Sequence, residues 1–167
     1  MSTFFWADLH LGHKNVVRYS EGARPITTED HDEWIVDQWN SVVHEKDLVY
    51  VLGDIAFDRK KLKLLLEMKG RKRLVSGNHD SGRIQELRKY FQRIYGFTKF
   101  KNYFWLSHAP IHPQSLRDLP NVHGHMHTAK VKCFTSTRTT VDGRYLCVSV
   151  DQFNKPVHLD EILTKLR

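Results

Sequence analysis

The chain has 167 residues, of which 40% are hydrophobic and 27% are charged. This composition argues against a disordered polymer and predicts one folded domain over residues 1–167. Two cysteines, with no leader-like segment and no long apolar run, argue against a secreted or membrane protein, so we expect a cytoplasmic location and no membrane partner. The formal net charge of +7 favours anionic partners such as phosphate esters or nucleic acid.

Apolar strand-like runs alternate with helical patterns along the chain, which predicts an α/β fold. We expect strands at about 3–7, 47–52, 72–76, 103–107 and 145–150. We expect helices at about 30–43, 62–68, 82–92 and 159–166. Asp142-Gly143 lies between Thr- and Val-rich flanks and predicts the turn of a β-ribbon over 131–150, which would form one wall of a site.

Side chains that can bind metals occur in five separate segments, most of them directly after a predicted strand. In chain order these segments are Asp8 with His10, Asp54, Gly77-Asn78-His79-Asp80, His108, and Gly124-His125-Met126-His127. Loops that leave the carboxyl ends of strands in an α/β sheet converge on one crevice. The five segments are therefore expected to form one site.

The donor atoms in these segments are carboxylate and amide oxygens and imidazole nitrogens, without cysteine. Such a mixture suits manganese, iron, nickel, cobalt or zinc better than calcium or magnesium. The set also exceeds what one open catalytic ion would use, because an ion takes roughly four to six donors including water. Two ions that share a carboxylate are the simplest arrangement.

Taken together and in order, these motifs resemble those of the calcineurin-like metallophosphoesterase superfamily over residues 8–127. The run from Ala7 to Asn15 further resembles the small, cap-less bacterial and phage members. The resemblance implies a sandwich of two mixed sheets flanked by helices (α/β/β/α). It also implies two divalent transition-metal ions per chain, with manganese first and iron, nickel, cobalt or zinc as alternatives. The implied ligands are Asp8, His10 and His127 for one ion, Asn78, His108 and His125 for the other, and Asp54 as the bridge.

The implied reaction is hydrolysis of a phosphodiester or a phosphomonoester by attack of a metal-bridging hydroxide. His79 would protonate the leaving group as the general acid, and Asp80 would orient its ring. Asn78 and His79 would also contact the substrate. Gly77 is expected to allow a sharp turn of the backbone.

Other polar residues have competing interpretations. His13 could be a metal ligand, a phosphate contact or a loop residue, and we place the phosphate contact slightly ahead. The dipeptide His31-Asp32 also marks an unrelated all-helical family of metal phosphohydrolases, but here it opens an amphipathic helix and we interpret it as coincidence. Four arginines are candidates for phosphate contacts, with placement on the surface as the commoner alternative: Arg18, Arg24, Arg117 and Arg138.

Two alternative functions compete with the phosphoesterase. The basic charge would also suit a nuclease that acts on DNA or RNA, which would need an extended basic track. A scaffold protein of the same fold that has lost its chemistry is the other alternative, although the complete set of ligands favours an enzyme. We expect a small phosphate ester, such as a nucleotide or a cyclic nucleotide, as the substrate. Either a monomer or a homodimer is compatible with the sequence.

Overall fold

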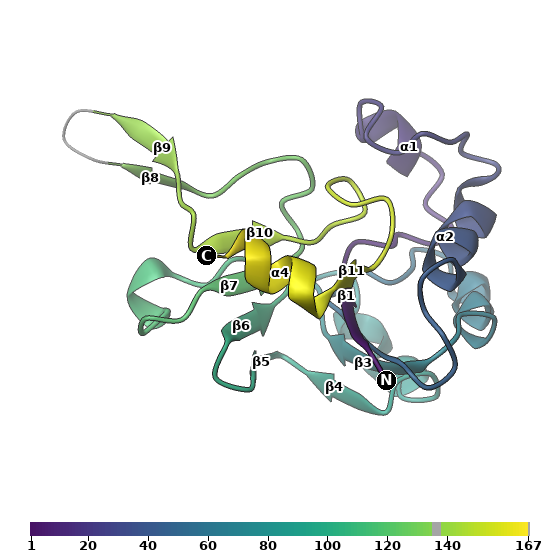
Figure 1. Ribbon diagram of the computed structural model, residues 1–167. Helices are drawn as coiled ribbons and strands as arrows, with labels where there is room; N and C mark the ends of the chain where they lie inside the picture. Colours follow the sequence, from purple (N-terminus) through teal and green to yellow (C-terminus); the bar gives the residue numbers. More distant parts are fainter. Residues whose placement is uncertain (135–137, 167) are drawn as a thin grey trace.

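Two mixed sheets form the body of the protein in the computed structural model, which describes residues 1–134 and 138–166 (Figure 1). In spatial order the first sheet contains β11 (Val157–His158), β1 (Thr3–Trp6), β2 (Leu48–Val51), β3 (Arg71–Val75) and β4 (Arg93–Tyr95). The second sheet contains β10 (Tyr145–Cys147), β7 (Asn121–His123), β6 (Phe104–Ser107) and β5 (Phe97–Phe100). β11 is antiparallel to β1 and β5 to β6, whereas the other pairs in these sheets are parallel.

The alternation of side chains along β1 explains why the first sheet is buried on both faces. Phe4 and Trp6 pack on the outer face with α2 (His31–Asn40) and the 3-10 helix η1 (Arg59–Leu66). Phe5 points to the opposite face, where it packs between the sheets against residues of β5, β6 and β7. Successive side chains of a strand point to opposite faces, so this short apolar strand contributes to both cores.

The expected fold class is confirmed: mixed sheets and helices make up the protein. The remaining helices are α1 (Val16–Tyr19), η2 (Ser81–Arg83), α3 (Ile84–Leu87), η3 (Pro113–Ser115) and α4 (Leu159–Lys165). No helix in the described part of the chain is long and apolar enough to cross a membrane.

The helix expected at 62–68 is instead the 3-10 helix η1, and it begins earlier. Leu62, Leu65 and Met68 are buried, whereas Leu66 is exposed. Within η1, the three-residue spacing of Leu62 and Leu65 places both side chains on one face of a helix with three residues per turn, and Met68 follows beyond its end. The Leu-rich composition predicted a helix but not its type.

The helix expected at 82–92 is much shorter, because η2 and the four residues of α3 are its only helical parts in the described chain. Two groups that could have stabilised its first turn have other partners. The Asp80 side chain does not cap η2, and Arg83 reaches back to the carbonyl oxygens of Ala56 and Phe57. The edge strand β4 begins at Arg93, directly after the range that was expected to be helical.

The β-ribbon expected over 131–150 forms between two strands that both precede Asp142-Gly143. β8 (Lys132–Phe134) pairs antiparallel with β9 (Thr139–Val141), and residues 135–137 lie outside the described residues. The turn at Asp142-Gly143 leads from β9 into β10, which pairs with β7. The ribbon points away from the two sheets (Figure 1). It therefore does not form the wall of the site that the sequence had suggested.

Backbone contacts beyond the strand ends join the two sheets. Ala7, just after β1, forms a parallel bridge with Ser149, just after β10. The amide of Val150 donates to the carbonyl oxygen of Ala7 at 3.0 Å, which adds a second contact between the two sheets. The loops that leave both sheets are thus held together at the carboxyl ends of the parallel strands.

Candidate metal centre

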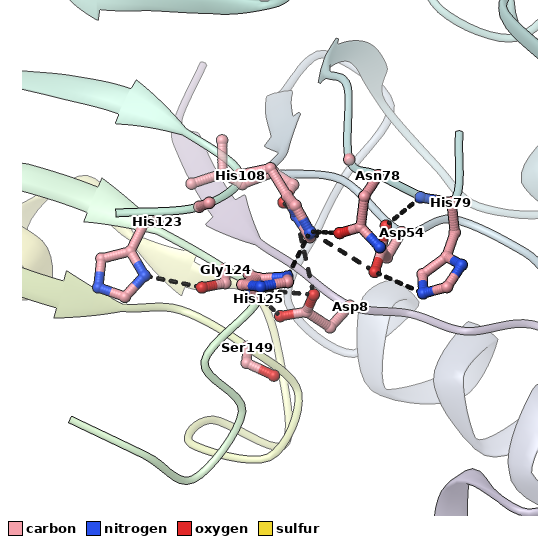
Figure 2. Close-up of polar contacts among 12 residues, drawn as sticks. Asp8, Asp54, Asn78, His79, His108, His123, Gly124, His125 and Ser149 are labelled. Atoms are coloured by element: carbon pink, nitrogen blue, oxygen red, sulfur yellow. Dashed lines mark hydrogen bonds and ion pairs between the residues drawn. The ribbon is translucent and has the colours of Figure 1, made fainter. Parts of the chain in front are cut away.

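The expected metal-binding side chains converge where the two sheets meet. Figure 2 shows His108 between Asn78, Asp54 and His125, with Asp8 beside them. Within each of two groups, the donor atoms lie within 4.8 Å of one another. The first donor group consists of Asp8, His10 and His127. The second donor group consists of Asp54, His108 and His125.

Most of these residues have a left-handed backbone, which is uncommon for residues other than glycine. The φ angles are 61° at Asp8, 52° at His10, 56° at Asp54, 65° at His125 and 49° at His127. This conformation costs an ordinary residue roughly 1–2 kcal/mol. Such strain tends to gather at functional sites. The loops therefore hold these side chains in positions that a relaxed backbone would not favour.

The first donor group contains polar atoms that lack partners among the described residues. Both ring nitrogens of His10 are buried and have no hydrogen-bond partner in residues 1–134 and 138–166. Burial also lowers the pKa of His10 well below its ordinary value, so the ring is neutral and has a free lone pair. A buried polar atom without a partner is costly. A cation beside His10 would accept this lone pair, so the group fits a metal ion.

The second donor group also brings lone pairs together. Nδ1 of His108 donates to the carbonyl oxygen of Leu52 at 2.8 Å, which leaves Nε2 without a proton in the neutral ring. Nε2 then faces the Asn78 amide oxygen at 2.8 Å and an Asp54 carboxylate oxygen at 3.5 Å. Three acceptors that point at each other need a cation between them. The donor set therefore fits a metal ion here as well.

Asp54 belongs to the second donor group and also faces the first. Its Oδ2 is 3.5 Å from Nε2 of His108 and 3.9 Å from Nε2 of His10. Its Oδ1 accepts a hydrogen bond from the backbone amide of His79 at 3.1 Å. The carboxylate is only 3% exposed. Asp54 therefore has the position that a bridging ligand would need.

Asp80 holds the loop that carries Asp54, which differs from its expected role. Its carboxylate accepts hydrogen bonds from the backbone amides of Asp54 at 2.9 Å, Ile55 at 3.0 Å and Gly77 at 2.8 Å. No hydrogen bond among the described residues joins it to the His79 ring. Asp80 therefore has no direct contact of this kind with the His79 ring, and its expected role in orienting that ring stays a prediction. Its buried carboxylate instead satisfies the amides of the left-handed loop.

Gly77 is required for close packing, whereas the sequence had suggested a sharp turn. Its φ is not positive, but a Cβ at this position would collide with the Asp54 carboxylate. Gly53 has a φ of 89°, and a Cβ there would collide with the His108 ring. Both glycines allow a backbone to approach a candidate ligand more closely than any side chain would permit.

Asp151 is a site residue that the sequence analysis missed. It accepts a hydrogen bond from Nδ1 of His127 at 2.7 Å, which fixes the orientation of this ring in the first donor group. Burial alone would raise the pKa of Asp151, but hydrogen bonds from His127 and Arg24 hold it below its ordinary value. The same bond raises the pKa of His127. A carboxylate that orients a ligating histidine in this way is common in metal sites.

Arg24 is buried, so it is neither a surface residue nor an open phosphate contact. It is 1% exposed and forms two hydrogen bonds with Asp151, at 3.1 and 2.9 Å. It also donates to the carbonyl oxygen of Asp8 at 2.8 Å and contacts Nε2 of His31 at 2.7 Å. His31 does begin α2, as expected, but it also contributes to this network. Arg18, Arg117 and Arg138 are exposed.

His79 and His13 lie at the rim of the two groups. The His79 side chain is 45% exposed, and its Nε2 is 3.8 Å from Asp54. His13 is partly buried, with its ring centre 5.8 Å from that of His10. His79 therefore combines access to solvent with proximity to the donor groups. The position of His13 also leaves room for a phosphate contact.

Burial of Asp8 makes the stability of the metal-free protein depend on pH. Burial raises the pKa of this carboxyl from 3.8 to about 6. The folded state therefore loses stability as the pH rises from about 4 to 6, because the unfolded chain ionises first. In the presence of a chelator, Asp8→Asn should raise the melting temperature by about 5 °C at pH 7 and much less at pH 4. Thermal melts at both pH values test this, and an equal difference at both would contradict it.

Asp151→Asn should weaken metal binding at the first donor group selectively. The amide keeps the volume of the side chain but cannot hold both His127 and Arg24 as a carboxylate does. Loss of such a partner typically lowers metal affinity about 10–100-fold. Titration with a chelator, followed by elemental analysis, should show one ion lost early and one retained. Asp142→Asn, which alters the ion pair with Arg144 outside the site, serves as the control. Equal losses in both variants would exclude the role of Asp151.

Comparison with known proteins agrees with this geometry. Residues 1–162 match the model of the calcineurin-like phosphoesterase family. The chain belongs to this family, as its motifs predicted. It is 30% identical over 165 residues to an uncharacterized protein of Methanocaldococcus jannaschii, an alignment that covers 94% of this chain and 86% of the relative.

Two further similarities are consistent with the family. Over 84 residues the chain is 39% identical to the gene 66 protein of Mycobacterium phage L5. This alignment covers 47% of this chain and 40% of the phage protein. The crystal structure of a protein of unknown function from Aquifex aeolicus has a TM-score of 0.73 and 24% identity, with 96% of this chain and 97% of that chain covered. This last similarity concerns the fold alone.

Proposed function

We propose that this protein is a dimetal phosphoesterase that hydrolyses phosphodiester or phosphomonoester bonds. The observation that carries the proposal is the position of Asp54 between two groups of donors, each with lone pairs that lack a proton or a partner. Membership of the calcineurin-like phosphoesterase family supports the reaction class. The chain's positive net charge of +7 supports an anionic substrate.

In this proposal, Asp8, His10 and His127 hold one ion, whereas Asn78, His108 and His125 hold the other. Asp54 contacts both. Bound together, two such ions lower the pKa of water, orient a phosphate and neutralise the charge that develops on its oxygens. The mixed oxygen and imidazole ligands favour manganese, with iron, nickel, cobalt or zinc as alternatives.

His79 has the role of general acid in this proposal. Its backbone amide is fixed by Asp54, while almost half of its side chain remains exposed. A histidine in such a position can contact a bound ester and also exchange its proton with water. Protonation of the leaving oxygen by a positioned side chain typically contributes 10²–10⁴-fold to the rate, as for general acids elsewhere.

Hydrolysis of bis-aryl and mono-aryl phosphates, after addition of each metal in turn, tests the proposal. We expect turnover with manganese and its loss after treatment with a chelator. Absence of turnover with every metal and both ester types would favour the scaffold alternative. DNA and RNA should be assayed in parallel, because cleavage of a polymer with little turnover of small esters would favour the nuclease.

A further inference from the structure

A cavity of about 300 Å³ opens beside the first donor group. Its polar lining includes His10, His127 and the proposed acid His79. Its apolar lining is formed by Phe57, Tyr19 and Val16. A concave site that combines an apolar wall with a few convergent polar groups is the usual form of a small-ligand pocket. This cavity therefore places an apolar surface beside the residues that are proposed to act in hydrolysis.

Phe57 is held firmly in the wall of the cavity. Its ring centre lies 4.5 Å from that of His79 and 4.2 Å from that of His13. Its carbonyl oxygen accepts a hydrogen bond from Arg83 at 2.6 Å, which fixes the backbone of the same loop. The ring remains partly exposed. A rigid and partly exposed aromatic side chain loses little conformational entropy when a ligand binds.

Tyr19 stands at the mouth of the same cavity and is 68% exposed. It is one of seven exposed large hydrophobic residues in the described chain, and within that group it alone lines this cavity. Its ring meets that of His13 edge to face at 6.1 Å. An exposed aromatic side chain beside a pocket commonly marks a binding surface.

We propose that this cavity is the leaving-group subsite, and that it takes a planar aromatic ring such as a nucleobase. The inference rests on the proposed function, because His79 would protonate the oxygen to which this group is attached. Phe57 and Tyr19 would contact the ring while the phosphate faces the donor groups. The volume is at the lower end of the range for small-ligand sites, roughly 300–1,000 Å³. It therefore suits one nucleoside better than a duplex.

Two ligands that differ only in the base provide the test. Adenosine 5′-monophosphate and ribose 5-phosphate share the same primary oxygen and sugar phosphate. Binding of each to the full-length protein should be measured by calorimetry, and KM should be measured where turnover occurs. Because a stacked base is commonly worth an order of magnitude or more in affinity, we expect the base to improve binding about tenfold.

Phe57→Leu and Tyr19→Leu should each reduce this advantage several-fold, while binding of ribose 5-phosphate stays the same. Phe97→Leu is the matched control, because Phe97 is 63% exposed on β5 and does not line the cavity. Tyr19→Leu decides the result if the Phe57 variant fails to fold, since Tyr19 is largely exposed. Circular dichroism checks the fold of each variant.

Two results would overturn the subsite: no advantage of the base in the wild-type protein, or an advantage that survives both substitutions. These results are distinct from failure of the proposed function. If binding of adenosine 5′-monophosphate depended on Phe57 but no ester were hydrolysed, the subsite would be supported and the proposed esterase activity would be excluded. Hydrolysis at a rate that does not depend on the base would support the esterase and remove the subsite.

Discussion

Asp54→Ala is expected to remove or scramble both metal ions and to lower turnover by about 10³-fold or more. The carboxylate faces His10 in one donor group and His108 in the other, so its loss weakens both groups at once. Removal of a single preorganised group that stabilises charge typically costs 10²–10³-fold in turnover. Loss of a ligand shared by two ions should exceed that range.

Elemental analysis of the purified variant measures the metal content directly. Asp37→Ala is a suitable control, because Asp37 is exposed on α2 and lies outside the site. It should retain the metal content and the activity of the wild-type protein. Full occupancy of both sites in Asp54→Ala would remove Asp54 from its bridging role, even if activity were lost.

His79→Ala should preserve the metal ions and slow the reaction according to the leaving group. An alkyl ester needs protonation of its leaving oxygen, so its turnover should fall about 10²–10⁴-fold. An activated aryl group departs without a proton, so its turnover should fall much less. The ratio of the two rates therefore separates an acid from a residue that only binds phosphate.

The same pair of esters should be measured with His44→Ala, a variant of an exposed histidine that belongs to neither donor group and does not line the cavity. This control should leave both rates unchanged. If His79→Ala lowered the aryl and alkyl rates by the same factor, the acid role would be untenable. A lower metal content in His79→Ala would point instead to a contribution to coordination.

The candidate donors were predictable because each lies next to an apolar run that becomes a strand or its continuation. Asp8 and Asp54 come shortly after the ends of β1 and β2, where a change from apolar to polar residues is visible in the sequence. Asp151 follows the strand predicted at 145–150 in a similar way, but its role as a hydrogen-bond partner of other side chains was not visible in the sequence. Its partners His127 and Arg24 are distant in the chain, and only folding brings the three together. Arg24 was misinterpreted for the same reason.

The fold was predictable where its segments are long and apolar. The short strands β4 and β11 at the edges of the first sheet were missed, because two or three residues give no periodic pattern. The role of Asp80 was missed for another reason. Its carboxylate binds backbone amides, and the positions of amides cannot be inferred from the identities of the residues that carry them.

Each donor group combines side chains from both sheets. The first takes Asp8 and His10 from the loop after β1 and His127 from the loop after β7. The second takes Asp54 from the loop after β2, with His108 and His125 from the loops after β6 and β7. A growing chain that ends at β4 would hold only part of each group. An ion that needs all ligands of a donor group would bind late in folding. It would then stabilise the contact between the two sheets, because its ligands come from loops of both.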